Sequence, residues 1–179
     1  MNHSQYVLIR CLALAAAVIA VAAACFGCAA KGVTGNEWLL MQEERLDELE
    51  LLADNMDEVF SLYVMGAIGS TDFLTEIELL KQQYAVMNEM YDAEKREYPI
   101  LPENNSYAAQ KGVEGLERVR EILGAILNNA AADGVPLPPD EAAYMYMAYK
   151  DELADNLAVY ITAVQYITAA TEGSDAGAD

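Results

Sequence analysis

The sequence predicts an all-α protein, an antiparallel up-down-up-down four-helix bundle that follows an N-terminal export signal. Three observations lead to this fold class. Four segments carry apolar residues at alternating three- and four-residue steps, a pattern that places them on one face of a helix. Glycine and proline separate these segments, and no segment has the alternation of a strand. Because short connections join antiparallel neighbours, four such helices predict an up-and-down order.

The N-terminal residues have the layout of an export signal. Between Arg10 and Lys31 lie 20 uncharged residues, half of them alanine. A positively charged start, an apolar centre and small residues at the end are typical of a segment that is removed after export. We therefore exclude residues 1–27 from the fold and treat 28–35 as a linker. The remaining chain, about 150 residues, is long enough for one domain with a core.

Small residues precede two cysteines, Cys25 and Cys28, at the end of the apolar segment. The arrangement resembles the lipobox of bacterial lipoprotein precursors, in which a cysteine is lipidated before the signal is removed. The stretch AAAC ends at Cys25 without the usual leucine, and the stretch CFGC ends at Cys28 with cysteine at an aliphatic place. The resemblance implies a lipid anchor at Cys28 or Cys25, on the extracytoplasmic face of the cell membrane. An uncleaved signal anchor and secretion after Ala24 or Ala30 are the alternatives.

The first predicted helix runs from residue 36 to residue 68. Thr34 and Glu37 have the spacing of a capping box, and Gly69 is expected to end the helix, with Ser70 or Thr71 capping the next one. The apolar residues of the first helix recur at steps near seven residues: Leu39, Leu46, Leu49, Met56, Phe60, Tyr63 and Ala67.

The second predicted helix, 72–97, has the most regular apolar face, and Pro99 and Pro102 stop it. Ile100 and Leu101, between these prolines, are expected to tuck under the domain. The residues of that face follow one another at steps of three or four: Phe73, Ile77, Leu80, Tyr84, Met87 and Tyr91.

The third predicted helix, 106–132, contains three glycines that either allow a close helix contact or soften the helix. They are Gly112, Gly115 and Gly124. The fourth helix, 139–171, begins with Pro139 and two acids, a favourable first turn. The bundle thus spans residues 36–171, and residues 172–179 have nothing to bury and are expected to be a disordered acidic tail.

The composition is strongly acidic, with a formal net charge of −19. Such a surface repels nucleic acid, so we expect no nucleic-acid partner. We interpret the charge mainly as a means of solubility, and recruitment of a basic partner or of divalent cations is the alternative. The acidic run EERLDELELLADNMDE has the helical spacing of a solvated face rather than the loop that calcium sites use.

Several kinds of catalytic and metal site lack a necessary residue. The only histidine, His3, and all three cysteines lie in the first 28 residues. Zinc sites of the Cys/His type, His-ligated haem, Ser-His-Asp triads and the Glu-x-x-His motif of di-iron bundles are therefore excluded from the exported domain. A hydrolase with paired carboxylates would need two acids marked by a cleft, and nothing marks a pair. We expect neither an enzyme nor a bound cofactor or metal.

Tyrosines gather on the predicted inward faces near the membrane-distal end. Tyr63, Tyr146 and Tyr149 are expected to meet Phe60 and Phe73 there. They form either an aromatic core or a shallow pocket or docking surface.

Met145 and Met147 resemble the methionine pairs of copper(I) proteins, but residues two apart do not face each other on a helix. We interpret them as core residues. The candidate binding residues are Tyr63, Phe73, Tyr146, Tyr149 and Met145.

These observations lead to two hypotheses of function. The first is a protein-interaction or scaffold module, held to the membrane by its lipid anchor. The alternative is a receptor for a small ligand that uses a tyrosine-rich pocket between helix ends. Since helix bundles host many functions, the fold class alone does not separate them.

Overall fold

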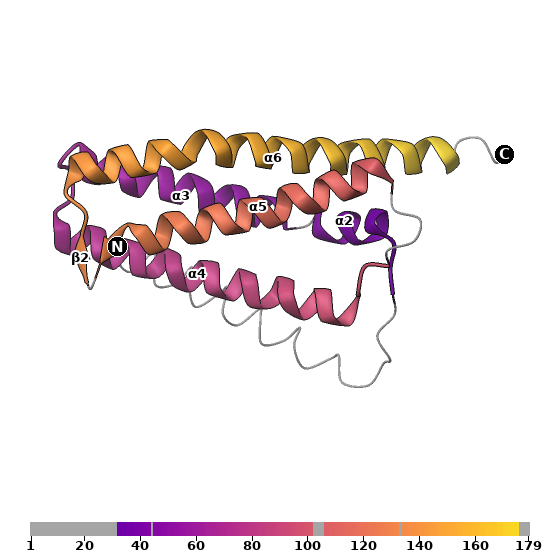
Figure 1. Ribbon diagram of the computed structural model, residues 1–179, viewed down its shortest axis with the longest axis horizontal. Helices are drawn as coiled ribbons and strands as arrows, with labels where there is room; N and C mark the ends of the chain where they lie inside the picture. Colours follow the sequence, from indigo (N-terminus) through magenta and orange to yellow (C-terminus); the bar gives the residue numbers. More distant parts are fainter. Residues whose placement is uncertain (1–31, 44, 102–105, 133, 176–179) are drawn as a thin grey trace, which may run out of the picture. The chain divides into compact units, whose positions relative to one another are not determined.

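The computed structural model describes residues 32–43, 45–101, 106–132 and 134–175, with side chains through residue 171. The predicted signal and lipidation residues Cys25 and Cys28 lie outside these residues. In the described part the protein is all-α, as the sequence predicts: α-helices account for nearly all regular structure, with one small hairpin (Figure 1).

The helix α2 (Gly35–Glu43) begins with the expected capping box. The backbone N–H of Glu37 donates to Thr34 Oγ1 at 3.2 Å, and the backbone N–H of Thr34 donates to Glu37 Oε2 at 2.8 Å. Each residue thus satisfies a backbone donor that the first helical turn leaves free.

The predicted first helix, 36–68, is divided into α2 and α3 (Leu46–Val64). Arg45 stands between them, and its backbone N–H donates to Gln42 O at 3.0 Å. Buried residues keep helical spacing across the break, so the apolar pattern gives no sign of it. The prediction of one continuous helix was wrong because long-range contacts, described below, hold this position.

The connection to α4 (Ser70–Glu97) also differs from the prediction. Helix α3 ends at Val64, and Gly66 adopts a φ of +71°, a left-handed conformation that favours glycine. Gly66, rather than Gly69, therefore ends the helix. Gly69 is the N-cap of α4, and Ser70 lies already in its first turn.

The start of the described chain is joined to the connection between α4 and α5 (Tyr107–Asn129). Val33 forms a parallel bridge with Ile100, whose side chain packs half-buried against the core, as expected. The same expectation was wrong for Leu101, which is 44% exposed. Ser106 caps α5 by accepting the N–H of Ala109 at 3.0 Å, and its hydroxyl donates to Asn36 Oδ1 at 2.7 Å. The beginnings of α2 and α5 are thereby tied together.

A hairpin that the sequence analysis did not predict joins α5 to α6 (Pro139–Asp175). Its strands, β1 (Ala131–Ala132) and β2 (Val135–Pro136), pair antiparallel, with Gly134 at a φ of +76°. The dipeptide DG before β2 is a signal for a two-residue turn. Helix α5 consequently ends at Asn129 instead of residue 132.

Helix α6 begins at Pro139, as predicted, and continues to Asp175. The expected tail, 172–179, therefore starts within this helix, and residues 176–179 lie outside the described residues.

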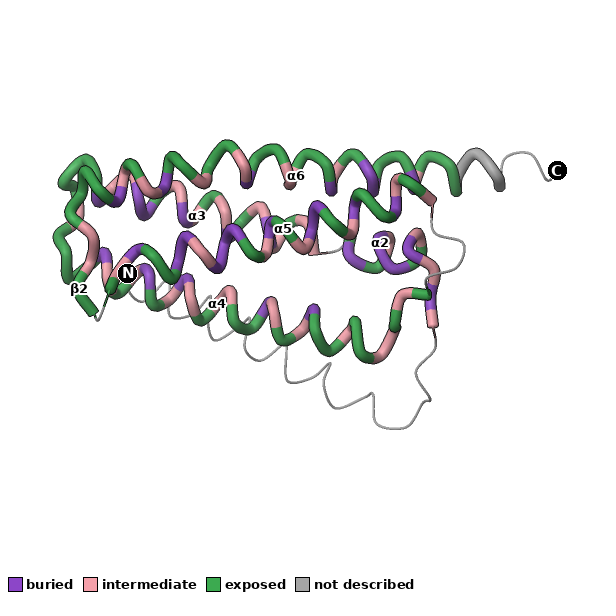
Figure 2. The backbone as a smooth tube through the Cα atoms, in the orientation of Figure 1, coloured by how far each residue is buried: buried purple, intermediate pink, exposed green. Residues whose placement is uncertain are grey.

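The buried residues fall on the sides of the helices that face one another (Figure 2). The closest contact joins α5 to α6 at two glycines. A Cβ atom on Gly115 would lie 3.1 Å from Asn156 O and 3.3 Å from Tyr160 N, both backbone atoms of α6. One on Gly112 would lie 2.8 Å from the Cβ of Ala163. The glycines thus serve close helix approach, one of the two roles that the sequence left open.

We predict that Gly115→Ala destabilises the protein by about 1–3 kcal/mol, because the backbone of α6 cannot yield to the added methyl group. The loss should outweigh the higher helix propensity of alanine, about 1 kcal/mol. Denaturant unfolding followed by circular dichroism measures the change. Gly69→Ala, where an added Cβ meets nothing within 4 Å and only the N-cap preference for glycine is lost, is the control and should cost less, about 0.5–1 kcal/mol. A Gly115→Ala variant as stable as the parent would contradict the prediction.

Candidate functional site

Three of the predicted site residues come together in one aromatic cluster with Phe60. The rings of Tyr63 and Phe73 stack with centroids 4.0 Å apart, and those of Phe60 and Tyr146 stack at 4.6 Å. Phe60 also meets Phe73 edge to face at 5.3 Å. The cluster joins α3, α4 and α6 near the hairpin.

The members of this cluster are packed as core residues. Tyr63 is 4% exposed, Tyr146 7% and Phe73 0%. The Tyr63 hydroxyl donates to Leu137 O at 2.9 Å, so its polar end is satisfied inside the protein. Burial raises the pKa of the Tyr146 phenol, and the nearby Asp57 carboxylate raises it further. Of the two interpretations of these tyrosines, the packing favours the aromatic core.

The other two predicted residues lie at the margin of the cluster. Tyr149 and Met145 are half-buried and pack against the core. The Tyr149 hydroxyl accepts a long hydrogen bond, 3.4 Å, from Asn129 Nδ2. Met147 is 69% exposed, so the interpretation of both methionines as core residues was wrong for Met147. Its position two residues from Met145 turns it to the opposite side of α6.

The four most exposed large apolar side chains near this aromatic cluster, each at least 66% exposed, form what we call the hairpin-end surface: Met65, Val135, Tyr144 and Met147. Met65 follows α3, Val135 lies in β2, and the other two lie in the first turns of α6. Each stands within two residues of the cluster or of Leu137, which binds Tyr63. The sequence analysis named only Met147 among them, because exposure at a helix end leaves no periodic signal.

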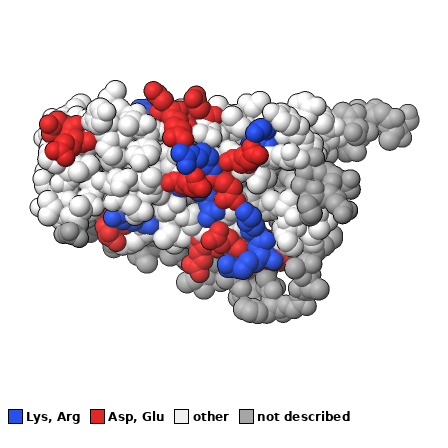
Figure 3. Space-filling view, viewed as in Figure 1, with Lys and Arg blue, Asp and Glu red and all other residues white. Residues whose placement is uncertain are grey.

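Three acidic side chains without a basic partner among the described residues stand at the starts of α4 and α6, the same end of the helices. Asp72, Asp140 and Glu141 are exposed in the first turns of α4 and α6, and none has an ion pair with a described residue. Most described basic residues are already paired with acids (Figure 3). The paired basic residues are Arg45, Lys95, Lys111, Arg118, Arg120 and Lys150.

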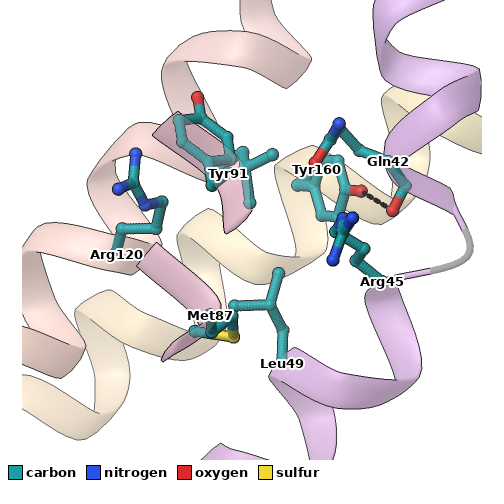
Figure 4. Close-up of a pocket in the computed structure, with 8 residues that line it drawn as sticks. Gln42, Arg45, Leu49, Met87, Tyr91, Arg120 and Tyr160 are labelled. Atoms are coloured by element: carbon teal, nitrogen blue, oxygen red, sulfur yellow. Dashed lines mark hydrogen bonds between the residues drawn. The ribbon is translucent and has the colours of Figure 1, made fainter. Parts of the chain in front are cut away.

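A second cluster, polar and partly buried, holds the break between α2 and α3 (Figure 4). The Glu94 carboxylate of α4 accepts Gln42 Nε2 at 2.8 Å and Arg45 Nε at 3.2 Å, and Arg45 Nη2 also binds it. The Tyr160 hydroxyl of α6 donates to Gln42 O at 2.8 Å, as the dashed line in Figure 4 shows. The sequence signal for this cluster was Gln42, a polar residue at a position where the helical spacing places a buried side chain.

Tyr91 and Arg120 extend this polar cluster towards α5. The Arg120 guanidinium lies 3.6 Å above the Tyr91 ring, and the Tyr91 hydroxyl donates to Glu117 Oε1 at 2.8 Å. Burial and the Glu117 carboxylate raise the pKa of Tyr91. Burial of Glu117 acts to raise its pKa, but hydrogen bonds from Lys95 and Tyr91 outweigh that effect, and the pKa is lowered.

The polar cluster leaves no room for a ligand. Its cavity has a volume of about 10 Å³, which is the space of one water molecule at most. Among the residues that the structure describes, no group of three or more acids, histidines or cysteines could hold a metal ion. We therefore interpret the cluster as a structural network that fixes α2 and α3 against α4, α5 and α6.

An open groove lies between the first turns of α5 and the second half of α6. Its volume is about 590 Å³. Tyr107, 76% exposed, and Tyr166, 65% exposed, belong to its walls. The sequence analysis missed both residues, although the absence of charge from residue 156 to residue 171 was visible. The groove is lined by mainly apolar and hydroxyl-bearing side chains, namely Ser106, Tyr107, Ala108, Lys111, Ala158, Val159, Thr162, Ala163 and Tyr166.

Comparison with known proteins adds no relative. No protein-family model matches the chain, and neither the curated proteins nor the solved structures contain a match to it. None of the described helices combines the length and the apolar character that a membrane crossing requires.

We predict that Tyr63→Phe lowers the free energy of unfolding by about 1 kcal/mol, because Leu137 O then loses its buried donor while the ring remains. Thermal unfolding monitored by circular dichroism gives the difference. Tyr149→Phe removes only the long bond to Asn129 at an exposed position and should cost less than about 0.5 kcal/mol. Equal stability of the two variants would show that the Tyr63 hydroxyl is not a structural contact.

A further variant tests the polar cluster. Glu94→Gln removes the carboxylate that binds Gln42 and Arg45, and we expect a loss of about 1.5–3 kcal/mol, the usual range for hydrogen bonds to a charged group. The matched control is Glu114→Gln, because Glu114 pairs with Lys111 on the surface, where its side chain is 65% exposed. Such exposed pairs contribute about 0–1 kcal/mol. The two variants are compared by urea unfolding, and a smaller loss for Glu94→Gln would refute the assigned role.

Proposed function

We propose that the protein is an exported, lipid-anchored interaction module that binds a partner protein through the hairpin-end surface. The exposure of Met65, Val135, Tyr144 and Met147 around one end of the helices carries this proposal. Single exposed apolar residues are ordinary, but several together are typical of a docking surface. Methionine adapts to irregular partner surfaces, which suits two of the four positions.

The proposal includes an up-down-up-down four-helix bundle made of α3, α4, α5 and α6. Its support is the set of packing contacts: each of these helices contacts the next in the chain, and α3 also contacts α6. The helices lie alongside one another in Figure 1. The helix α2 continues the α3 position beyond the break and packs against α5 and α6.

The proposed anchor is the lipid carried by Cys28 or Cys25. Its support is the export-signal layout of the first residues and the lipobox-like stretches that end at the two cysteines. The first described residues pair with the chain just after α4, where Val33 bridges Ile100, and this is the other end of the helices from the hairpin (Figure 1). In this proposal the hairpin-end surface therefore faces away from the membrane.

The proposed partner is a protein with a basic rim around an apolar contact. Asp72, Asp140 and Glu141 stand in the first turns of α4 and α6 and would meet that rim. Complementary charge steers such partners together and excludes acidic competitors. We propose no catalytic activity, no cofactor and no nucleic-acid partner. The alternative, a small-ligand receptor at the distal tyrosines, has less support because Tyr63 and Tyr146 are packed in the core.

Binding of designed peptides tests this proposal. We expect the full chain, in neutral detergent, to bind an amphipathic helical peptide of lysine and leucine, and not the same peptide with glutamate in place of lysine. Met65→Ser combined with Met147→Ser should weaken binding about tenfold or more, since each docked methionine contributes about 1 kcal/mol. Fluorescence anisotropy of the labelled peptide gives the affinity.

The control for this experiment combines Met41→Ser with Val86→Ser, two exposed apolar residues outside the hairpin-end surface. It should leave the peptide affinity unchanged. If both double variants bind alike, the hairpin-end surface is not the docking site. If the glutamate peptide binds as well as the lysine peptide, the proposed partner chemistry is wrong.

A further inference from the structure

We propose that the groove between α5 and α6 rests on the lipid bilayer to which the chain is anchored, with Tyr107 and Tyr166 at the level of the lipid headgroups. This inference rests on the proposed anchor. It assigns a partner to a surface that the interaction at the hairpin end does not use.

The position of the groove relative to the start of the described chain supports the inference. Ser106, in the wall of the groove, donates a hydrogen bond of 2.7 Å to Asn36, only four residues after Gly32. Cys28 precedes Gly32 by four residues, and such a length of chain spans at most about 14 Å. A lipid on Cys28 would therefore hold this end of the protein close to the membrane.

The charge of this surface also fits a bilayer. The chain has a net charge of −19, which a membrane with anionic lipids repels. However, α6 has no charged residue from Asn156 to Thr171, and this stretch forms one wall of the groove. The single charged side chain of the groove, Lys111, is paired with Glu114. An uncharged surface can approach headgroups without a large cost of desolvation.

The side chains at the rim of the groove suit the boundary between water and lipid. Tyr107 and Tyr166 are mostly exposed. Val159, which also lines the groove, is 42% exposed. Tyrosine is enriched at membrane interfaces, because its ring is apolar and its hydroxyl remains hydrated. Exposed alanine and threonine complete the α6 wall of the groove, which has no charged side chain.

Tryptophan substitution with brominated lipids tests the inference on the full chain. The protein is purified from membranes of a bacterial host and placed in phosphatidylcholine vesicles, with or without bromine on the acyl chains near the headgroup. Trp38 is the only tryptophan and is fully buried, so the parent supplies the background emission. Tyr166→Trp adds a probe at the groove, and Tyr144→Trp, at the hairpin end of the same helix, is the matched control.

We expect about twofold quenching of the added emission in Tyr166→Trp, because side chains at the interface sit within about 5–10 Å of the acyl boundary. Tyr144→Trp should show no quenching. Equal quenching of both variants, or of neither, would overturn the inference. An emission of Tyr166→Trp that changes with protein density, and not with bromine, would show that a second copy of the chain covers the groove.

The anchor is tested separately in the same preparation. The parent should be recovered with the membrane, and Cys25→Ala combined with Cys28→Ala should release it. Retention of this double variant, or a parent that is not membrane-bound, contradicts the proposed anchor. A parent that is bound and released as expected, but with an unquenched Tyr166→Trp, contradicts only the contact between the groove and the bilayer.

Discussion

The contact of α5 with α6 determines where the remaining helices can pack. At Gly115 a Cβ atom would lie 3.1 Å from a carbonyl oxygen of α6, so the two backbones are nearly as close as side-chain-free helices allow. Leu39 of α2 fills the neighbouring space, 2.6 Å from where a Cβ of Gly112 would lie. A larger residue at either glycine would separate α5 from α6 and displace α2. The glycines cost helix propensity, and the packing that they permit compensates for it.

The excess of acidic residues imposes the second constraint, because few basic side chains are available to pair with many acidic ones. Five ion pairs in the described part join different helices or the segment before α3: Arg45–Glu94, Lys95–Glu117, Arg120–Asp92, Arg118–Glu152 and Lys150–Asp57. Exposed pairs of this kind add little stability individually. Their placement nevertheless reduces repulsion where helices meet, and it leaves the unpaired acids on outward surfaces. The same distribution leaves the acids near the hairpin free to meet the basic partner that we propose.

The sequence predicted what local pattern controls and missed what distant contacts control. The all-α class, the capping box at Thr34 and the start of α6 at Pro139 follow from neighbouring residues, and the structure has them. At the break before Leu46, Arg45 binds Glu94, 49 residues away, and the polar Gln42 was the one local sign of this contact. The aromatic cluster was predicted because its members lie on apolar seams. Exposure of Met147, Tyr107 and Tyr166 was not, since it depends on where neighbouring helices end.

The two ends of the helices differ in chemistry, and this difference connects the two proposals. From Asn156 to Thr171 the helix α6 has no charged residue and carries Tyr166, whereas the hairpin end combines exposed methionine with acids at the starts of α4 and α6. In the two proposals the uncharged surface meets a bilayer and the acidic end meets a basic protein. The packed helices α5 and α6 separate the hairpin end from the anchored end by their length. A partner bound at the hairpin would therefore stand a helix length from the lipid. An anchored protein whose two ends differ in this way needs no conformational change to present its docking surface.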